Sequence, residues 1–210
     1  MKDNLLETKQ RIFQYWYIDG LPELALGGIF LILGLYFYIQ AVIPNENLLG
    51  QILNVGFVVI IIGSVYLTRF LIGYFKNRLT YPRTGYVAYQ RKPGQYRWIR
   101  VILAMGIAAL VAGLIIAFPG YEKLMPAITA IILSLVFLTF GYRGSILRFY
   151  LLSLISLVLG GVFSFLGTGG NIGLGYYYFL IGMICSLSGG CILRSYLKKY
   201  PDKPEDDHVG

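Results

Sequence analysis

The sequence predicts an all-α integral membrane protein with six transmembrane helices arranged as three hairpins. Of its 210 residues, 57% are hydrophobic and 13% are charged, whereas soluble domains carry about 25% charged residues. The mean hydropathy of +0.66 excludes an intrinsically disordered chain, because disorder requires low hydrophobicity. Aromatic residues make up 16% of the chain, which is typical of a protein that lines two membrane interfaces with Tyr and Trp.

The positions of the charged residues mark out the spans. Five stretches of 19 to 45 residues contain no Asp, Glu, Lys or Arg, and a helix that crosses a bilayer needs about 20 apolar residues. The longest stretch, residues 149–193, is divided by a glycine-rich turn at residues 167–173. We therefore expect a transmembrane domain at residues 21–197, with spans at residues 22–43, 52–74, 101–118, 125–142, 147–167 and 174–195.

The distribution of Lys and Arg predicts the orientation of these spans. If both termini are cytoplasmic, all but one of the 18 basic residues lie on the inner side, and Lys123 is the exception. This is the asymmetry that the positive-inside rule predicts for a membrane protein with both termini in the cytoplasm. It also explains the net charge of +8 by proximity to an anionic leaflet, so nucleic acid is not an expected partner.

Residues 1–20 are predicted to form an amphipathic helix in the cytoplasmic interface. Apolar residues, Trp16 and Tyr17 among them, recur at helical spacing, and charged residues lie elsewhere around the helix. The helix either anchors the first span or docks a soluble partner. Residues 19–23 then turn the chain into the first span, because Pro22 and Glu23 suit a first helical turn. Residues 198–210 form a cytoplasmic tail.

Catalytic and metal-binding patterns are missing from the sequence. Cys185 and Cys191 are six residues apart on one predicted helix, so they face different directions and serve as packing residues. The single histidine, His208, lies in the acidic tail, and no phosphate-binding loop is present. No span carries a charge near its centre, which disfavours transport coupled to a buried carboxylate. We expect no enzymatic activity and no cofactor or metal.

Glycines seven residues apart predict close helix packing. Such a spacing returns to nearly the same helical face, and small residues let another backbone approach. The spacing recurs in the first and last spans, at Gly20, Gly27 and Gly34 and at Gly175, Gly182 and Gly189, and the second span contains the pair Gly56 and Gly63.

Residues 24–34 and 157–167 resemble each other within the chain, with seven identities in eleven positions. Both segments lie in spans of the same direction, which suggests three related helical hairpins. Convergence of two spans rich in Leu and Gly explains the match equally well.

The cytoplasmic loop at residues 75–100 contains seven basic residues and no acidic one. Alternation at residues 81–89 fits a short β-hairpin after a turn. Basic and aromatic side chains in one segment suit anionic lipid headgroups or a protein partner, although the loop could equally serve only to set topology. The residues expected to form this surface are Tyr81, Pro82, Arg83, Gly85, Tyr86, Arg91 and Lys92.

Two motifs resemble those of a family of uncharacterised bacterial multi-span membrane proteins. They are Tyr-Pro-Arg-x-Gly-Tyr-Val at residues 81–87 and Asp-Gly-x-Pro-Glu at residues 19–23. The resemblance covers about a dozen residues and implies a bacterial inner-membrane location. It implies no activity.

An electrostatic latch is expected at the inner ends of the spans. Asp19 and Glu23 are the acidic residues there outside the terminal segments, and low dielectric strengthens their attraction to cations. Either they pair with arginines and tie the loop to the first span, or the spare arginines form an anion site. The arginines predicted at this depth are Arg69, Arg83, Arg143 and Arg148.

The function expected from these features is that of a non-enzymatic scaffold or regulatory subunit. Its cytoplasmic face would engage anionic lipid or a membrane or cytoplasmic protein. A passive or lipid-type transporter that uses the serines in the spans is the alternative. A weaker alternative is an enzyme acting on lipid headgroups with Asp19, Glu23, Arg83 and Arg143.

Overall fold

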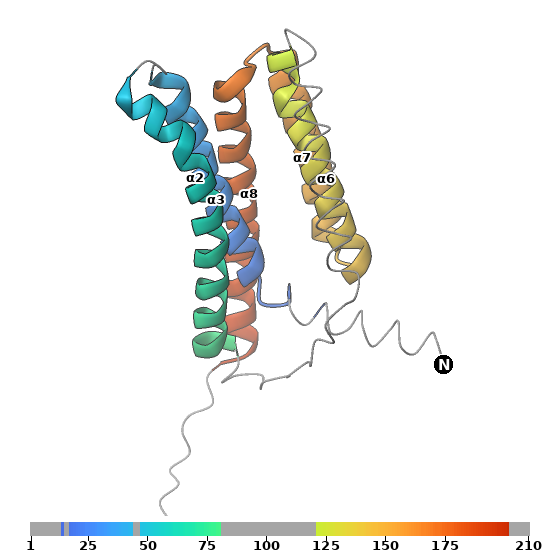
Figure 1. The fold of residues 1–210 in the computed structure, drawn as a ribbon. Helices are drawn as coiled ribbons and strands as arrows, with labels where there is room; N and C mark the ends of the chain where they lie inside the picture. Colours follow the sequence, from blue (N-terminus) through green and yellow to red (C-terminus); the bar gives the residue numbers. More distant parts are fainter. Residues whose placement is uncertain (1–13, 15–16, 44–46, 81–120, 202–210) are drawn as a thin grey trace, which may run out of the picture.

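The computed structural model describes residues 14, 17–43, 47–80 and 121–201, and these residues form helices and turns without a strand (Figure 1). The helices are α2 (Leu21–Val42), α3 (Leu48–Phe75), α6 (Met125–Gly144), α7 (Leu147–Phe165) and α8 (Gly170–Lys199). A π-helical turn, Lys76–Thr80, follows α3, and a 3-10 turn, Tyr121–Leu124, precedes α6.

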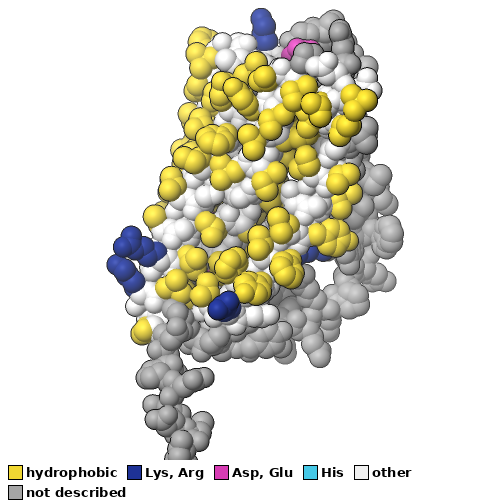
Figure 2. All heavy atoms as spheres, turned by 90° about the vertical axis from the view of Figure 1, so that its left-hand side faces the viewer, with side chains coloured by type: hydrophobic (Ala, Val, Ile, Leu, Met, Phe, Trp, Pro, Cys, Tyr) yellow, Lys and Arg dark blue, Asp and Glu magenta, His cyan; other side chains and the backbone are white. Residues whose placement is uncertain are grey.

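Four of the described helices are long and apolar enough to cross a membrane. They correspond to the first, fourth, fifth and sixth predicted spans: Leu21–Val42, Glu122–Gly144, Leu147–Phe165 and Gly170–Lys199. Hydrophobic side chains cover the middle of the face shown in Figure 2, and Lys and Arg side chains lie toward its ends. The chain is therefore a helical membrane protein.

The second predicted span coincides with α3, a helix of 28 residues. The third predicted span, at residues 101–118, lies outside the described residues, as do the predicted hairpin at residues 81–89, nearly all of the N-terminal amphipathic helix and most of the tail.

The last span begins earlier than the sequence predicts, at Gly170 instead of residue 174. Gly167 and Gly170 adopt positive φ angles of 69° and 68°, and the Thr168 hydroxyl donates to the Phe163 carbonyl at 3.1 Å. The chain therefore reverses its direction within residues 166–169, and residues 170–173, which were predicted to belong to the turn, form the first turn of α8.

The most extensive helix packing joins the first and last described spans, α2 and α8. Their glycines lie against the opposite backbone. A Cβ atom on Gly34 would lie 2.6 Å from the Phe179 amide nitrogen, and one on Gly182 would lie 2.8 Å from the Leu31 amide nitrogen. The seven-residue spacing in these two helices thus produces backbone contact, as predicted.

A second pair consists of α6 and α7, which pack where Gly160 faces Ala130. The Ser134 and Ser153 hydroxyls bond across this interface at 2.7 Å. The pair meets α2 and α8 through a shared apolar core. The buried members of that core are Phe30, Ala130, Phe137, Phe149, Leu152, Tyr177, Ile181 and Cys185.

Two of the three predicted hairpins, α2 with α3 and α7 with α8, are therefore not the main packing units of the described helices, and the third includes residues 101–118, which lie outside the described residues. Helices α2 and α3 are in contact, and so are α7 and α8, but the interfaces of α2 with α8 and of α6 with α7 are far larger. Figure 1 shows α2, α3 and α8 together and α6 with α7 beside them. In the two similar segments, Gly27 and Gly160 both lie at close helix contacts, against α8 and α6 respectively.

Candidate functional site

A cluster of buried charged residues lies where α2 begins, at the end of the bundle that is predicted to be cytoplasmic. It is built on the turn that precedes α2. Gly20 has a φ of 70°, and a Cβ atom there would lie 2.6 Å from the Gly189 carbonyl oxygen. Only glycine satisfies both requirements, so this turn packs closely against α8, with Asp19 directly before it and Glu23 in the first turn of α2.

Asp19 is completely buried and joins the end of α3 to the beginning of α2. Its Oδ1 accepts from the Leu21 amide at 3.2 Å. Its Oδ2 accepts from the Thr80 hydroxyl at 3.1 Å and lies 3.3 Å from Lys76 Nζ. Three donors therefore compensate for the lost hydration of this carboxylate.

Lys76 is the partner cation, and its side chain is only 3% exposed. Burial lowers the pKa of the Lys76 ammonium, and the Asp19 carboxylate opposes part of that shift. The pair holds two opposite charges in a dry site, where removing either partner would leave the other uncompensated.

Glu23 is the second buried acid, with 1% of its side chain exposed. Its Oε1 lies 2.5 Å from Arg148 Nε, and its Oε2 accepts from the Ser188 hydroxyl at 3.2 Å. These contacts connect α2 to the first turn of α7 and to α8. The structure thus brings together two residues of the predicted latch, Glu23 and Arg148.

Arg148 also reaches the chain before α2, because its Nη2 donates to the Tyr17 carbonyl. The Tyr17 ring packs edge-on against Phe149, with centroids 5.4 Å apart, and beside Phe140 at 6.0 Å. Burial, and secondarily the negative charge of Glu23, raises the pKa of Tyr17. Gln14 donates to the Gly144 carbonyl at 2.8 Å, so this segment is also tied to α6.

Two of the other predicted site residues, Arg69 and Arg143, are not part of the cluster. Arg69 and Arg143 are exposed and form no ion pair with the described residues. Asp19 pairs with a lysine, not with one of the predicted arginines. Arg83 lies outside the described residues, and so do the other predicted loop residues, which are Tyr81, Pro82, Gly85, Tyr86, Arg91 and Lys92.

Sequence reasoning missed Lys76, Thr80 and Ser188. Lys76 directly follows the apolar run of the second predicted span, at the depth assigned to Asp19. Its position in the sequence could therefore have identified it as a partner of Asp19. Thr80 and Ser188 had none, since serines and threonines are common in membrane helices and their partners depend on tertiary packing.

Hydroxyl groups in the interior of the bundle bond to one another or to the backbone. Ser156 and Tyr177 share a hydrogen bond of 2.7 Å, and Ser156 Oγ also lies 3.2 Å from the Ala130 carbonyl. Ser164 Oγ accepts from the Ala127 amide at 3.0 Å. These groups bridge α6, α7 and α8, which is the structural use of serine in membrane helices.

Within the described residues, no group of three or more His, Cys, Asp or Glu side chains lies close enough to hold a metal ion. Compared with known proteins, the chain matches no family model, no curated protein and no solved structure.

Proposed function

We propose that this chain is a six-span bacterial inner-membrane protein, with both termini in the cytoplasm, that acts without catalysis. In this proposal it serves as a scaffold or regulatory subunit, and the exposed basic residues at its cytoplasmic rim engage anionic lipid or an acidic surface of a partner protein.

One observation carries the proposal: among the described residues at this end, the acidic ones are buried and paired, whereas several basic ones are exposed. Asp19 and Glu23 each have a cation partner inside the protein. Arg143, Arg194, Lys198 and Lys199 are exposed and form no ion pair with the described residues. The part of this surface that the described residues form is therefore positively charged.

The pairing of the acidic residues gives the enzymatic alternative little support. A headgroup-acting enzyme needs a carboxylate that can bind a metal ion or exchange a proton with substrate, but both carboxylates are committed to internal contacts. Transport of a polar solute also has little support, since the interior hydroxyls of Ser134, Ser153 and Ser156 bond within the bundle.

Affinity purification from native membranes, followed by quantitative mass spectrometry, tests this function. The test variant replaces Arg143, Arg194, Lys198 and Lys199 by Gln. The control replaces Lys123, a basic residue at the opposite end, by Gln. A specific partner or an enrichment of anionic lipid should be lost in the test variant and retained in the control. Equal recovery with both variants would contradict the proposal.

A further inference from the structure

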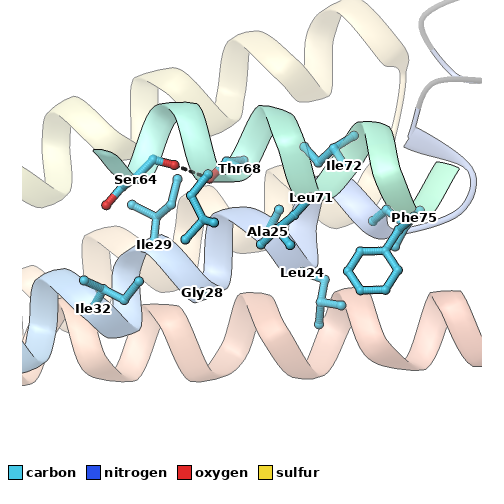
Figure 3. Close-up of a pocket in the computed structure, with 12 residues that line it drawn as sticks. Leu24, Ala25, Gly28, Ile29, Ile32, Ser64, Thr68, Leu71, Ile72 and Phe75 are labelled. Carbon is cyan, nitrogen blue, oxygen red and sulfur yellow. Dashed lines mark hydrogen bonds between the residues drawn. The ribbon is translucent and has the colours of Figure 1, made fainter. Parts of the chain in front are cut away.

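We propose that the pocket between α2 and α3 binds one acyl chain of an anionic phospholipid from the cytoplasmic leaflet. The assignment of leaflet rests on the orientation given under the proposed function. The pocket has a volume of about 170 Å³ and is partly open. Figure 3 shows side chains from both helices lining it, with Gly28 on the α2 side.

The lining of the pocket is suited to hydrocarbon. Ten of its twelve residues are apolar or glycine. The two hydroxyls donate within their own helix, from Ser64 to the Ile60 carbonyl at 2.6 Å and from Thr68 to the Ser64 carbonyl at 2.7 Å. No lining side chain therefore offers a free donor that would retain water, and an apolar pocket of this kind takes apolar ligands.

The pocket is open where a lipid could enter. Among its lining residues, Ile32, Leu67 and Phe75 are 43%, 49% and 38% exposed, so its mouth lies on the outer surface of the bundle. A Cβ atom on Gly28 would meet nothing within 4 Å. In a membrane-spanning protein, the medium at such a surface is the lipid acyl region.

The length of the pocket matches one leaflet. Its lining runs from Leu21 to Ile32 on α2 and from Ser64 to Phe75 on α3. Eleven residue steps at 1.5 Å give about 16 Å along each helix. The hydrocarbon core of a bilayer is about 30 Å thick, so the pocket extends through about half of it, starting at the rim.

One exposed cation lies just beyond the rim end of the pocket, and a second lies on α3 about midway along the length of the pocket. Arg78 is exposed two residues after Lys76, and its Nη1 donates to the Tyr74 hydroxyl at 3.0 Å. Arg69 is exposed on α3 about 9 Å before Phe75 along the helix axis, so its long side chain would have to extend toward the rim to reach a headgroup. Neither arginine pairs with a carboxylate among the described residues. Their charge complements a phosphate headgroup whose acyl chain would follow the pocket into the membrane.

Photo-crosslinking tests the acyl-chain site. The full-length protein is reconstituted in phosphatidylethanolamine vesicles that contain phosphatidylglycerol with a diazirine on one acyl chain, and adducts are mapped by peptide mass spectrometry. We expect adducts on α2 and α3 at the lining residues. Gly28→Leu should lower this labelling about tenfold, a change equivalent to about 1.4 kcal/mol of binding free energy, and Gly28→Ala should lower it less.

Gly161→Leu is the matched control. Gly161 aligns with Gly28 in the internal repeat, and its added Cβ atom would likewise meet nothing within 4 Å. This variant should label as the wild type does. Unchanged labelling in Gly28→Leu, or equal losses in the two leucine variants, would overturn the site.

The headgroup contribution is tested by replacing both Arg69 and Arg78 with Gln. This variant should lose its preference for the phosphatidylglycerol probe over a phosphatidylcholine probe of the same chain. A disulfide between Gly28→Cys and a cysteine placed within residues 101–118, together with absent lipid labelling, would show that the chain itself fills the pocket. Absence of lipid labelling at the lining residues of the unaltered protein, with partner recovery unchanged, would overturn this inference alone and leave the proposed function standing.

Discussion

At the scale of single residues, the ion pair between Glu23 and Arg148 is the contact with the widest consequences. Desolvating a carboxylate costs free energy that a good ion pair and hydrogen bonds can offset. Here Arg148 occupies one oxygen of Glu23 and Ser188 the other. Arg148 in turn holds the Tyr17 carbonyl. One pair thus joins α2, α7, α8 and the chain before α2.

A double-mutant cycle measures this coupling. Glu23→Gln should lower the free energy of unfolding in detergent by about 3 kcal/mol, the lower end for breaking a buried pair, because it leaves the partly buried guanidinium without its counter-charge. Arg148→Gln should cost a similar amount. The double variant should lose clearly less than the sum of the single losses, since neither charge is then left unpaired.

Arg69→Gln and Arg143→Gln are the controls, because both arginines are exposed and have no carboxylate partner in the described part of the chain. Each should combine additively with Glu23→Gln. Additivity in the cycle with Arg148 as well would refute the latch.

At the scale of the helix, glycine determines which surfaces come together. Gly182 faces the α2 backbone, whereas a Cβ atom on Gly190, in the same helix, would meet nothing within 4 Å. Gly182→Ala should therefore destabilise the protein by about 2 kcal/mol through overpacking. Gly190→Ala should be neutral or stabilise by up to about 1 kcal/mol, because alanine favours helix over glycine.

Thermal unfolding of the two alanine variants in the same detergent checks this difference. A melting temperature that falls equally in both would mean that α2 and α8 do not approach as closely as the structure describes.

The sequence was sufficient to place these elements but not to pair them. Uncharged runs and glycine spacing are local signals, and they located the described spans and the packed faces of α2 and α8. A glycine stripe does not identify the backbone that will lie against it. Gly56 and Gly63 have the same spacing, yet Cβ atoms there would meet nothing within 4 Å. The pairing of α2 with α8 depends on tertiary packing across most of the chain.

The candidate site shows the same division. Charge and position were enough to single out Asp19, Glu23 and Arg148. The pairing of each acid with a cation depends on where the helices end, and the sequence places these ends only to within several residues. Asp19 therefore pairs with Lys76 instead of the expected arginine. Hydrogen-bonding partners such as Ser188 follow from the rotation of α8 about its axis, which composition does not report.

At the scale of the whole molecule, the glycine contacts and the charged cluster stabilise different parts of the bundle. Glycines bring α2 against α8, and Gly160 brings α7 against α6. Asp19 and Glu23 then connect these pairs, and α3, at one end. Among the described residues the ion pairs lie at that end, while the bundle interior relies on apolar packing and hydroxyl bonds. Because the two ends of the bundle differ in charge, the side of the membrane that the charged end faces can be predicted and tested.

We expect the charged end to face the cytoplasm, because translocating a cluster of Lys and Arg across the membrane is disfavoured. Single cysteines, placed in a background with Cys185 and Cys191 replaced by alanine, test this in intact cells with a membrane-impermeant maleimide. Glu46→Cys and Glu122→Cys should react from outside, whereas Arg83→Cys and Lys198→Cys should react only after the cells are opened. Glu122 and Lys198 lie at opposite ends of the described bundle, so they form the matched pair. Reaction of Lys198→Cys or Arg83→Cys in intact cells would show the opposite orientation. The proposed lipid site would then lie in the other leaflet.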